Sequence, residues 1–205
     1  MSQQQHPIDD DLVPEQVEGY VVTEKKTIEE YKNLDAEDES LAKWKASLGL
    51  TSDSNPYPVK TGDKRKVVIV EMGIEFPEDP KLAPIRVNLE DVDGNTILNK
   101  EIKFNIKEKS VYQLVIKFRV QHEIITGLKY LHSVKRAGVR VDKMDEPLGS
   151  YAPNTVENPF YERKFAEIEA PSGMIARGNY NAVSKFVDDD QTVHLTVPWS
   201  FAITK

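Results

Sequence analysis

From residue 66 onward, apolar and polar residues alternate along the chain, and this period of two constrains the fold more than any other feature. Successive side chains of a β-strand point to opposite faces of its sheet, so the alternation predicts strands with one buried face. The two clearest runs are Tyr112, Leu114, Ile116, Phe118 and Val120, and Val193, Leu195, Val197, Trp199, Phe201 and Ile203. Because no long helical period follows residue 50, we predict an all-β, immunoglobulin-like sandwich over residues 66–205.

Three local signals interrupt the alternation. The apolar phase that begins at Val67 changes before Met72, which indicates an irregularity inside the first strand. Asp93-Gly94 is a sequence pair typical of hairpin turns. Pro198 lacks a backbone N–H for a sheet hydrogen bond, so it predicts an edge position or a bulge at that point of the last strand.

The formal net charge of -7 is concentrated in an N-terminal arm. The first 40 residues carry 12 Asp or Glu and 3 Lys or Arg, whereas the remaining 165 carry 22 and 24. A phosphate backbone is bound by clustered Lys and Arg, so this balance disfavours nucleic acid as the partner of the arm. We expect a partly disordered segment that is either solvated or seeks a protein partner.

Two short helices are predicted within the arm, near residues 27–34 and 36–48. The first begins at a capping box of Thr27 and Glu30, and the second carries Leu41, Trp44 and Leu48 on one stripe. Helices of this length are marginal in water without a surface to pack on. Their stripes therefore dock either on the rest of this chain or on another protein. Residues 51–65 resemble a linker in composition, so the predicted division is 1–65 and 66–205.

Catalytic and metal-binding patterns are missing from the sequence. There is no cysteine, no H-E-x-x-H, no P-loop and no G-x-S-x-G, so we predict that the protein is not an enzyme and uses no cofactor or metal. The acidic run 188–190 is either a carboxylate cluster for a cation or a solvated turn between strands. We favour the turn.

Several features predict an intracellular, cytoplasmic protein without stable membrane insertion. No apolar run approaches the ~18 residues that a membrane helix needs. The first residues have neither the basic region nor the apolar core of a secretory signal, and the chain has no cysteine for disulfides.

Five stretches of the sequence, in the same order, resemble stretches of the Rho GDP-dissociation inhibitors. They are LDAEDESL at 34–41 with the following Lys43, Trp44 and Lys45, EIITGLKY at 123–130, VRVDK at 139–143 with GSY at 149–151, APSGMIARG at 170–178, and FVDDD at 186–190. Their common order makes a chance similarity improbable. The resemblance extends from about Tyr20 to the C-terminus.

For the arm, the resemblance implies a clamp on a GTPase. The expected partners are prenylated Rho-family small GTPases of the Rho, Rac or Cdc42 type, preferentially in the GDP-bound state. The arm would hold the switch regions and so resist the opening that nucleotide exchange requires. Asp38 would accept a hydrogen bond from the switch I threonine, with Ser40, Leu41 and Trp44 on the same contact face. The family usually has Tyr where Trp44 stands.

For the sandwich, the resemblance implies an isoprenoid-binding site that accepts the geranylgeranyl chain of the GTPase and so extracts it from membranes. The residues expected to line this pocket are Ile74, Phe104, Tyr112, Ile124, Ala182 and Trp199. Ala182 stands where the family often has isoleucine, which predicts a wider pocket on that side. Glu167 and Glu169 are expected to meet the basic tail of the GTPase, and Asp190 its body.

Two other classes of function are compatible with the same pattern. One is a general carrier of prenyl or other lipid chains, which would bind the chain regardless of the attached protein. The other is an immunoglobulin-like scaffold without a lipid site, whose interior would be filled by side chains. Binding of unprenylated GTPase and the presence of a cavity are the observations that discriminate between them.

Overall fold

The computed structural model describes residue 12, residues 55–97 and residues 101–205. The helices predicted near 27–34 and 36–48 lie outside these residues. The described part is all-β and contains no helix, and so none that could cross a membrane. Its strands are β1 (Val67–Glu75), β2 (Ile85–Asn88), β3 (Lys103–Lys107), β4 (Val111–Val120), β5 (Ile125–Arg136), β6 (Val139–Tyr151), β7 (Tyr161–Glu169), β8 (Gly178–Val187) and β9 (Val193–Thr204).

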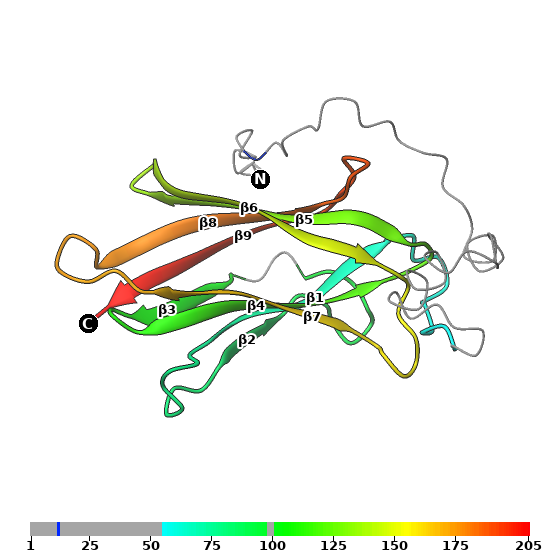
Figure 1. Cartoon of the computed structure of the whole chain (residues 1–205), viewed down its shortest axis with the longest axis horizontal. Coiled ribbons are helices and arrows are strands. Elements are labelled where there is room, and N and C mark those ends of the chain that lie inside the picture. The colour runs from blue at the N-terminus through cyan, green and yellow to red at the C-terminus, as the bar shows by residue number, and fades with distance from the viewer. Residues whose placement is uncertain (1–11, 13–54, 98–100) are drawn as a thin grey trace, which may run out of the picture.

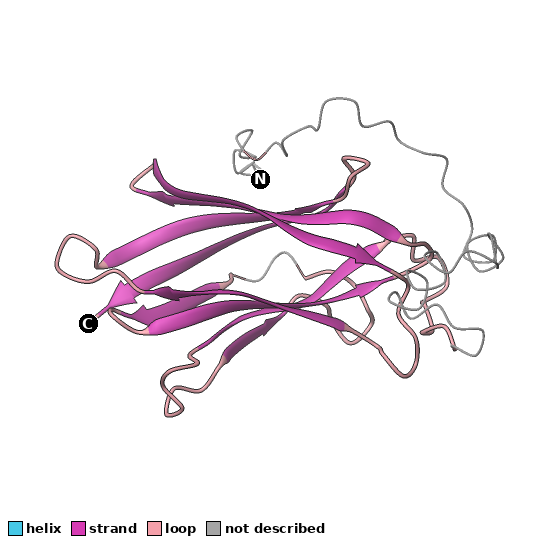
Figure 2. Cartoon of the chain, in the orientation of Figure 1, coloured by secondary structure: helices cyan, strands magenta, loops and turns pink. Residues whose placement is uncertain are grey.

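The strands form two sheets that face each other, as the predicted sandwich requires (Figures 1 and 2). One sheet has the order β2-β1-β4-β7 and the other the order β3-β9-β8-β5-β6. All pairs are antiparallel except β3 with β9. The inward residues of both sheets make one core, which includes Phe104, Phe118, Tyr130 and Phe186 at no measurable exposure. The fold class expected from the alternation is confirmed.

The local irregularities also fall where the sequence places them. In β1 the pairing with β4 shifts between Ile69 and Glu71, so the apolar phase changes there because of a β-bulge. Gly94 has a φ of 77° in a turn closed by the bond from its N–H to the carbonyl of Asp91, 3.0 Å. Pro198 pairs with β8, and the β3 ladder on the other side of β9 involves Ser200 and the residues after it.

Strands β5, β6, β7 and β8 were not assigned from the alternation, and for β5 and β6 the burial of their side chains explains why. β5 lies between β6 and β8, and several consecutive residues near its C-terminal half are buried, so its apolar residues do not follow a period of two. β6 is an edge strand with mostly exposed side chains and therefore lacks a repeated apolar position. In β5 and β6, the position of the strand within the sheet determines which side chains are buried and therefore which positions are apolar.

Leu12 is buried on the outer face of the five-stranded sheet. Its side chain packs with Leu131, Val187 and the partly buried Val183, and its carbonyl accepts a hydrogen bond from Lys185 Nζ at 2.9 Å. Leu131 and Val187 thus point away from the space between the sheets, and they are buried because Leu12 packs on them. This contact adds a second, smaller apolar cluster to the core.

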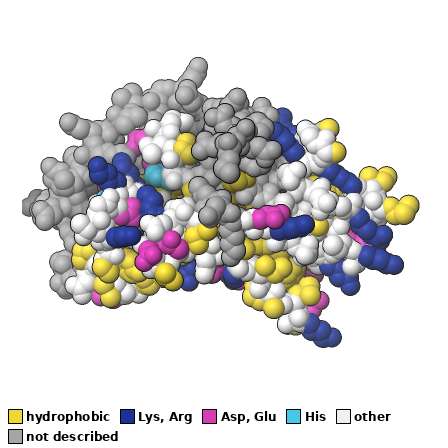
Figure 3. All heavy atoms as spheres, turned by 180° about the vertical axis from the view of Figure 1, so that it is seen from behind, with side chains coloured by type: hydrophobic (Ala, Val, Ile, Leu, Met, Phe, Trp, Pro, Cys, Tyr) yellow, Lys and Arg dark blue, Asp and Glu magenta, His cyan; other side chains and the backbone are white. Residues whose placement is uncertain are grey.

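The two ends of the sandwich differ in the segments that meet there. At the distal end, on the left of Figure 1, strands β3, β5, β7 and β9 end and strands β4, β6 and β8 begin. Figure 3 shows the molecule from behind, and hydrophobic side chains lie beside Lys and Arg at this end, now on the right. The opposite end, which we call the junction end, receives residues 55–66.

Candidate functional site

An apolar cavity of about 340 Å³ lies between the two sheets. Small-molecule sites in proteins typically have ~300–1,000 Å³ and apolar walls with a few polar groups, so this cavity has the size and character of a ligand site. Its walls come from both sheets. The lining residues are Ile74, Ile106, Tyr112, Leu114, Tyr130, His132, Val134, Arg136, Val141, Asp142, Met144, Phe165, Ala166, Ile168, Pro171, Tyr180, Trp199 and Phe201.

The cavity opens between the edge strands β6 and β7 near the distal end. Val141 and Asp142 on β6 and Ala166 and Ile168 on β7 line the cavity and are also exposed to solvent. Lining residues farther inside, such as Tyr130, are buried. An elongated apolar ligand can therefore enter from the side of the sandwich without unpairing a strand.

A β-bulge in β7 directs side chains of this strand toward the cavity. Gln113 on β4 pairs with Glu167 and Val115 pairs with Lys164, so β7 has one more residue than β4 between these pairs. The extra residue reverses the alternation, which brings both Phe165 and Ala166 to the cavity wall. After the bulge the even-numbered positions face inward.

Three polar side chains of the cavity wall form a short hydrogen-bonded chain through Ser184, which lies behind them. Trp199 Nε1 donates to Ser184 Oγ at 2.9 Å, and Ser184 Oγ lies 2.7 Å from the hydroxyl of Tyr130. That hydroxyl lies 3.3 Å from Nδ1 of His132. The indole N–H can only donate. All the hydrogen bonds are therefore formed when Ser184 donates to Tyr130, Tyr130 donates to His132, and the neutral imidazole accepts at Nδ1. The cavity thus buries polar groups without leaving these hydroxyls unpaired.

Burial keeps His132 neutral in this chain. Removal from water lowers the pKa of His132 from 6.5 to about 4, and the nearby charge of Asp142 opposes this shift only in part. The imidazole also stacks on the ring of Trp199, with 5.5 Å between the ring centroids. A neutral, stacked imidazole presents an apolar face to the cavity.

Acidification is expected to destabilise the fold through His132. The pKa of the folded state lies below the ordinary 6.5, so the unfolded chain takes up the proton first as the pH falls, and stability is lost between pH 6.5 and about 4. At pH 5 the expected loss from this residue is about 2 kcal/mol relative to pH 7. Urea unfolding of the wild type and of His132→Phe at both pH values measures it. An equal loss of stability between pH 7 and pH 5 in both proteins would contradict the assignment of this loss to His132.

The structure places the six predicted pocket residues in two groups. Ile74, Tyr112 and Trp199 line the cavity. Phe104, Ile124 and Ala182 are buried but do not line it. Phe104 packs edge-on against Trp199, with 5.5 Å between ring centroids, and so supports the wall from behind.

Most of the cavity wall was not predicted from the sequence, and the larger part of it comes from strands without a clear alternation. Tyr130, His132 and Val134 on β5 alternate toward the cavity, and Val141 and Met144 come from β6. Leu131 and Ser133, which lie between these positions of β5, are also buried, so no period of two marked the cavity face of β5 in the sequence. Nothing in the pattern of β6 distinguished its cavity residues from surface residues.

The predicted acidic contacts lie far apart on the sandwich. Glu167 and Glu169 are exposed near the distal end of β7, an edge strand. Asp190 is in the turn between β8 and β9, and β8 runs from the distal end toward the junction end. The two groups therefore cannot belong to one small site. Asp38, Ser40, Leu41 and Trp44 lie outside the described residues.

The acidic run 188–190 lies in the predicted turn. Asp188 is buried, accepts a hydrogen bond from the backbone N–H of Thr192 at 2.9 Å and lies 2.9 Å from Nε2 of His194. Gly127, with a φ of 56°, lies so close to the carboxylate of Asp189 that a Cβ at this position would overlap it. The stretches 123–130 and 186–190 thus meet in space. Within the described ranges, no group of three His, Asp or Glu side chains has the arrangement of a metal site.

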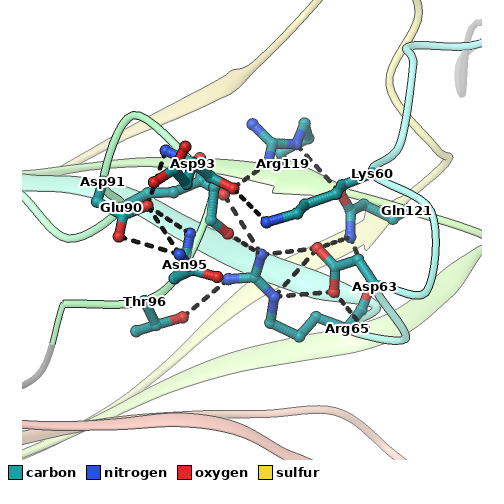
Figure 4. A network of polar contacts seen from close by, with 11 residues as sticks. Lys60, Asp63, Arg65, Glu90, Asp91, Asp93, Asn95, Thr96, Arg119 and Gln121 are labelled. Atoms are coloured by element: carbon teal, nitrogen blue, oxygen red, sulfur yellow. Dashed lines mark hydrogen bonds and ion pairs between the residues drawn. The ribbon is translucent and has the colours of Figure 1, made fainter.

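Residues 55–66 are fastened to the junction end by a polar network (Figure 4). Arg65 forms a fork with the carboxylate of Asp63, with its Nη2 2.6 Å from Oδ2, and this pairing holds the pKa of Asp63 well below its usual range. Arg119 donates to Glu90 at 2.9 Å, and Gln121 donates to the carbonyl of Arg65 at 2.8 Å. The network fixes the direction in which the chain enters the sandwich.

Comparisons with known proteins identify the family of the chain. The family model for the RHO protein GDP dissociation inhibitor matches residues 4–205. The chain is similar to the Rho GDP-dissociation inhibitor of Saccharomyces cerevisiae, with 56% identity over 91% of this chain and 90% of the relative. The Schizosaccharomyces pombe protein of that name is 44% identical over 89% of this chain and 84% of the relative. Human Rho GDP-dissociation inhibitor 1 is 37% identical over 91% of this chain and 86% of the relative. The chain therefore belongs to the Rho GDP-dissociation inhibitor family.

Proposed function

We propose that the protein binds prenylated Rho-family GTPases in the GDP-bound state and buries the geranylgeranyl chain in the cavity between the sheets. The observation that carries the proposal is the apolar cavity of about 340 Å³ that opens at the side of a sandwich from this family. Each buried CH₂ group contributes ~0.8 kcal/mol, so a geranylgeranyl chain gains on the order of 10 kcal/mol. This free energy is comparable with the free energy that anchors the lipid chain in a bilayer. Transfer of the chain from the membrane to the cavity is therefore thermodynamically feasible.

The scaffold alternative requires an interior filled by side chains, and the cavity speaks against it. A general carrier of lipid chains is the remaining alternative, because an apolar wall does not recognise the attached protein. The arm is what would distinguish an inhibitor from a carrier. In the proposed function, Asp38, Ser40, Leu41 and Trp44 hold the switch regions and slow GDP release.

Trp199 reports directly on occupation of the cavity, because its ring lines the wall and its Nε1 is hydrogen bonded inside. The chain has 2 tryptophans, so Trp44→Phe leaves Trp199 as the single tryptophan fluorophore. We expect the emission to change when a geranylgeranylated peptide is added and to stay constant with the same peptide without the lipid. A flat titration with the lipidated peptide would refute the proposed site.

Asp38→Ala is expected to weaken binding of an unprenylated, GDP-loaded Rho GTPase by roughly tenfold, since one charge-assisted hydrogen bond is worth about 1.4 kcal/mol or more. The affinity for a geranylgeranylated peptide should not change. Calorimetric titration of both ligands into the wild type and the variant tests this. If the wild type shows no affinity for unprenylated GTPase, the general lipid carrier is the better description.

A further inference from the structure

A turn at the distal end presents two apolar side chains to solvent. Met174 and Ile175 occupy the centre of the turn after β7 and are 86% and 89% exposed. The N–H groups of Ala176 and Arg177 both donate to the carbonyl of Gly173 at 3.1 Å, so the turn is formed. Turn centres usually carry Gly, Pro, Asn, Asp or Ser, and two large apolar residues there are unusual.

The turn is held from both sides, so it projects as a fixed structure. Arg136 donates through its guanidinium to the carbonyls of Ile175 and Arg177, the latter at 2.8 Å. Glu108 accepts from Gly173 N at 2.9 Å and pairs with Arg177 at 2.7 Å. None of these contacts involves the side chain of Met174 or Ile175, and both apolar side chains remain exposed.

Exposed apolar side chains gather at this end of the molecule. Single exposed apolar residues are ordinary on protein surfaces and need no explanation. Of the eight large hydrophobic side chains that are exposed in the described residues, five lie at the distal end. These five are Val139, Val141, Ile168, Met174 and Ile175.

Positive charge surrounds the apolar group (Figure 3). The cations at the strand ends and turns of the distal end are Lys107, Lys109, Lys135, Arg136, Arg140 and Arg177. The carboxylates in the same region are those of Glu108, Asp142, Glu167 and Glu169, and Glu108 is paired with Arg177, so the cations still outnumber the carboxylates. An excess of Lys and Arg around apolar side chains matches the anionic headgroups and the acyl boundary of a membrane surface.

We propose that the distal end is a membrane-docking surface, with Met174 and Ile175 entering the headgroup region of an anionic bilayer. Pro171, in the segment that leads to this turn, lines the cavity. A docked molecule therefore brings the cavity mouth to the bilayer, and a lipid chain can pass between them with little exposure to water. This role in transfer rests on the proposed prenyl-binding function, whereas docking itself does not.

Sedimentation of the full chain with phosphatidylcholine vesicles containing about 30% phosphatidylserine tests the proposal. The double variant Met174→Ser and Ile175→Ser is expected to bind at least about tenfold less than the wild type. The matched control is Val92→Ser, because Val92 is fully exposed in the turn after β2, toward the junction end. The control should bind as the wild type does, and vesicles of phosphatidylcholine alone should bind all three proteins weakly.

The affinity for a geranylgeranylated peptide separates the two proposals. The double variant should keep this affinity, because neither residue lines the cavity. If vesicle binding depends on the turn but no protein binds the lipidated peptide, docking stands and the prenyl-binding function fails. Equal vesicle binding by the wild type and the double variant overturns docking. A variant that loses unprenylated GTPase instead of vesicles would show a protein interface and also overturn it.

Discussion

Leu114→Trp is expected to weaken binding of a geranylgeranylated peptide by about 100-fold, since the indole would displace several CH₂ groups worth ~0.8 kcal/mol each. Leu114 is half-buried on β4 and lines the cavity, so the larger ring has free volume to enter. The fold should therefore tolerate the change. Fluorescence anisotropy of a labelled lipidated peptide measures the affinity, and thermal unfolding measures the stability.

The matched control is Leu82→Trp, the same change at a partly buried residue that packs on the core but does not line the cavity. We expect it to leave peptide affinity unchanged. Binding of unprenylated GTPase should be the same in both variants, because that contact is assigned to the arm. Undiminished peptide binding by Leu114→Trp would show that the lipid occupies a different place.

Arg119→Met is expected to lower the free energy of unfolding by about 3 kcal/mol, because removal of one partner from a buried ion pair leaves the other charge uncompensated. The side chains of Arg119 and Glu90 are only 9% and 11% exposed, and their contact measures 2.9 Å. The remaining partner of Glu90 is Arg65 at 3.5 Å, which is a weak replacement. Urea unfolding measures the change.

The same substitution should loosen residues 55–66, since the Arg119 guanidinium lies 5.1 Å from the ring centroid of Tyr57. Hydrogen exchange of the amides in this segment is expected to accelerate more than that of β5 or β8. Combining Arg119→Met with Glu90→Leu should recover part of the lost stability, because no buried charge is then left over. A loss below about 1 kcal/mol in the single variant would show that the pair is effectively solvated.

The sequence predicted strands β1, β2, β3, β4 and β9 from their alternation but not β8, whose buried residues also alternate. In β4 and β9 the inward residues are apolar at every second position, so the sequence pattern predicts these strands directly, although Val115 and Arg119 on the other face of β4 are also buried. The bulge in β1 was visible as a change of phase. Strand β5 was harder to predict from the sequence, because its interior place in the sheet and the contact of Leu131 with Leu12 bury residues on both of its faces.

The candidate site was only partly predictable. Ile74, Tyr112 and Trp199 stand on strands with clear alternation and line the cavity, but alternation cannot separate a cavity wall from filled core. Phe104 illustrates this, since it has the same pattern and is fully packed. The bulge that brings Ala166 to the wall involves one extra residue in β7, and no residue type marks it.

By itself, the sequence determined the all-β class, the concentration of acidic residues in the arm and the family resemblance, because each depends on residue type and order along the chain. Only the tertiary structure decided that the sheets leave a cavity, that it opens between β6 and β7, and that Met174 and Ile175 project beside its mouth. These features depend on how two sheets of different strand order pack against each other. Packing between residues distant in the chain has no local signature, which is why the structure was needed to find them.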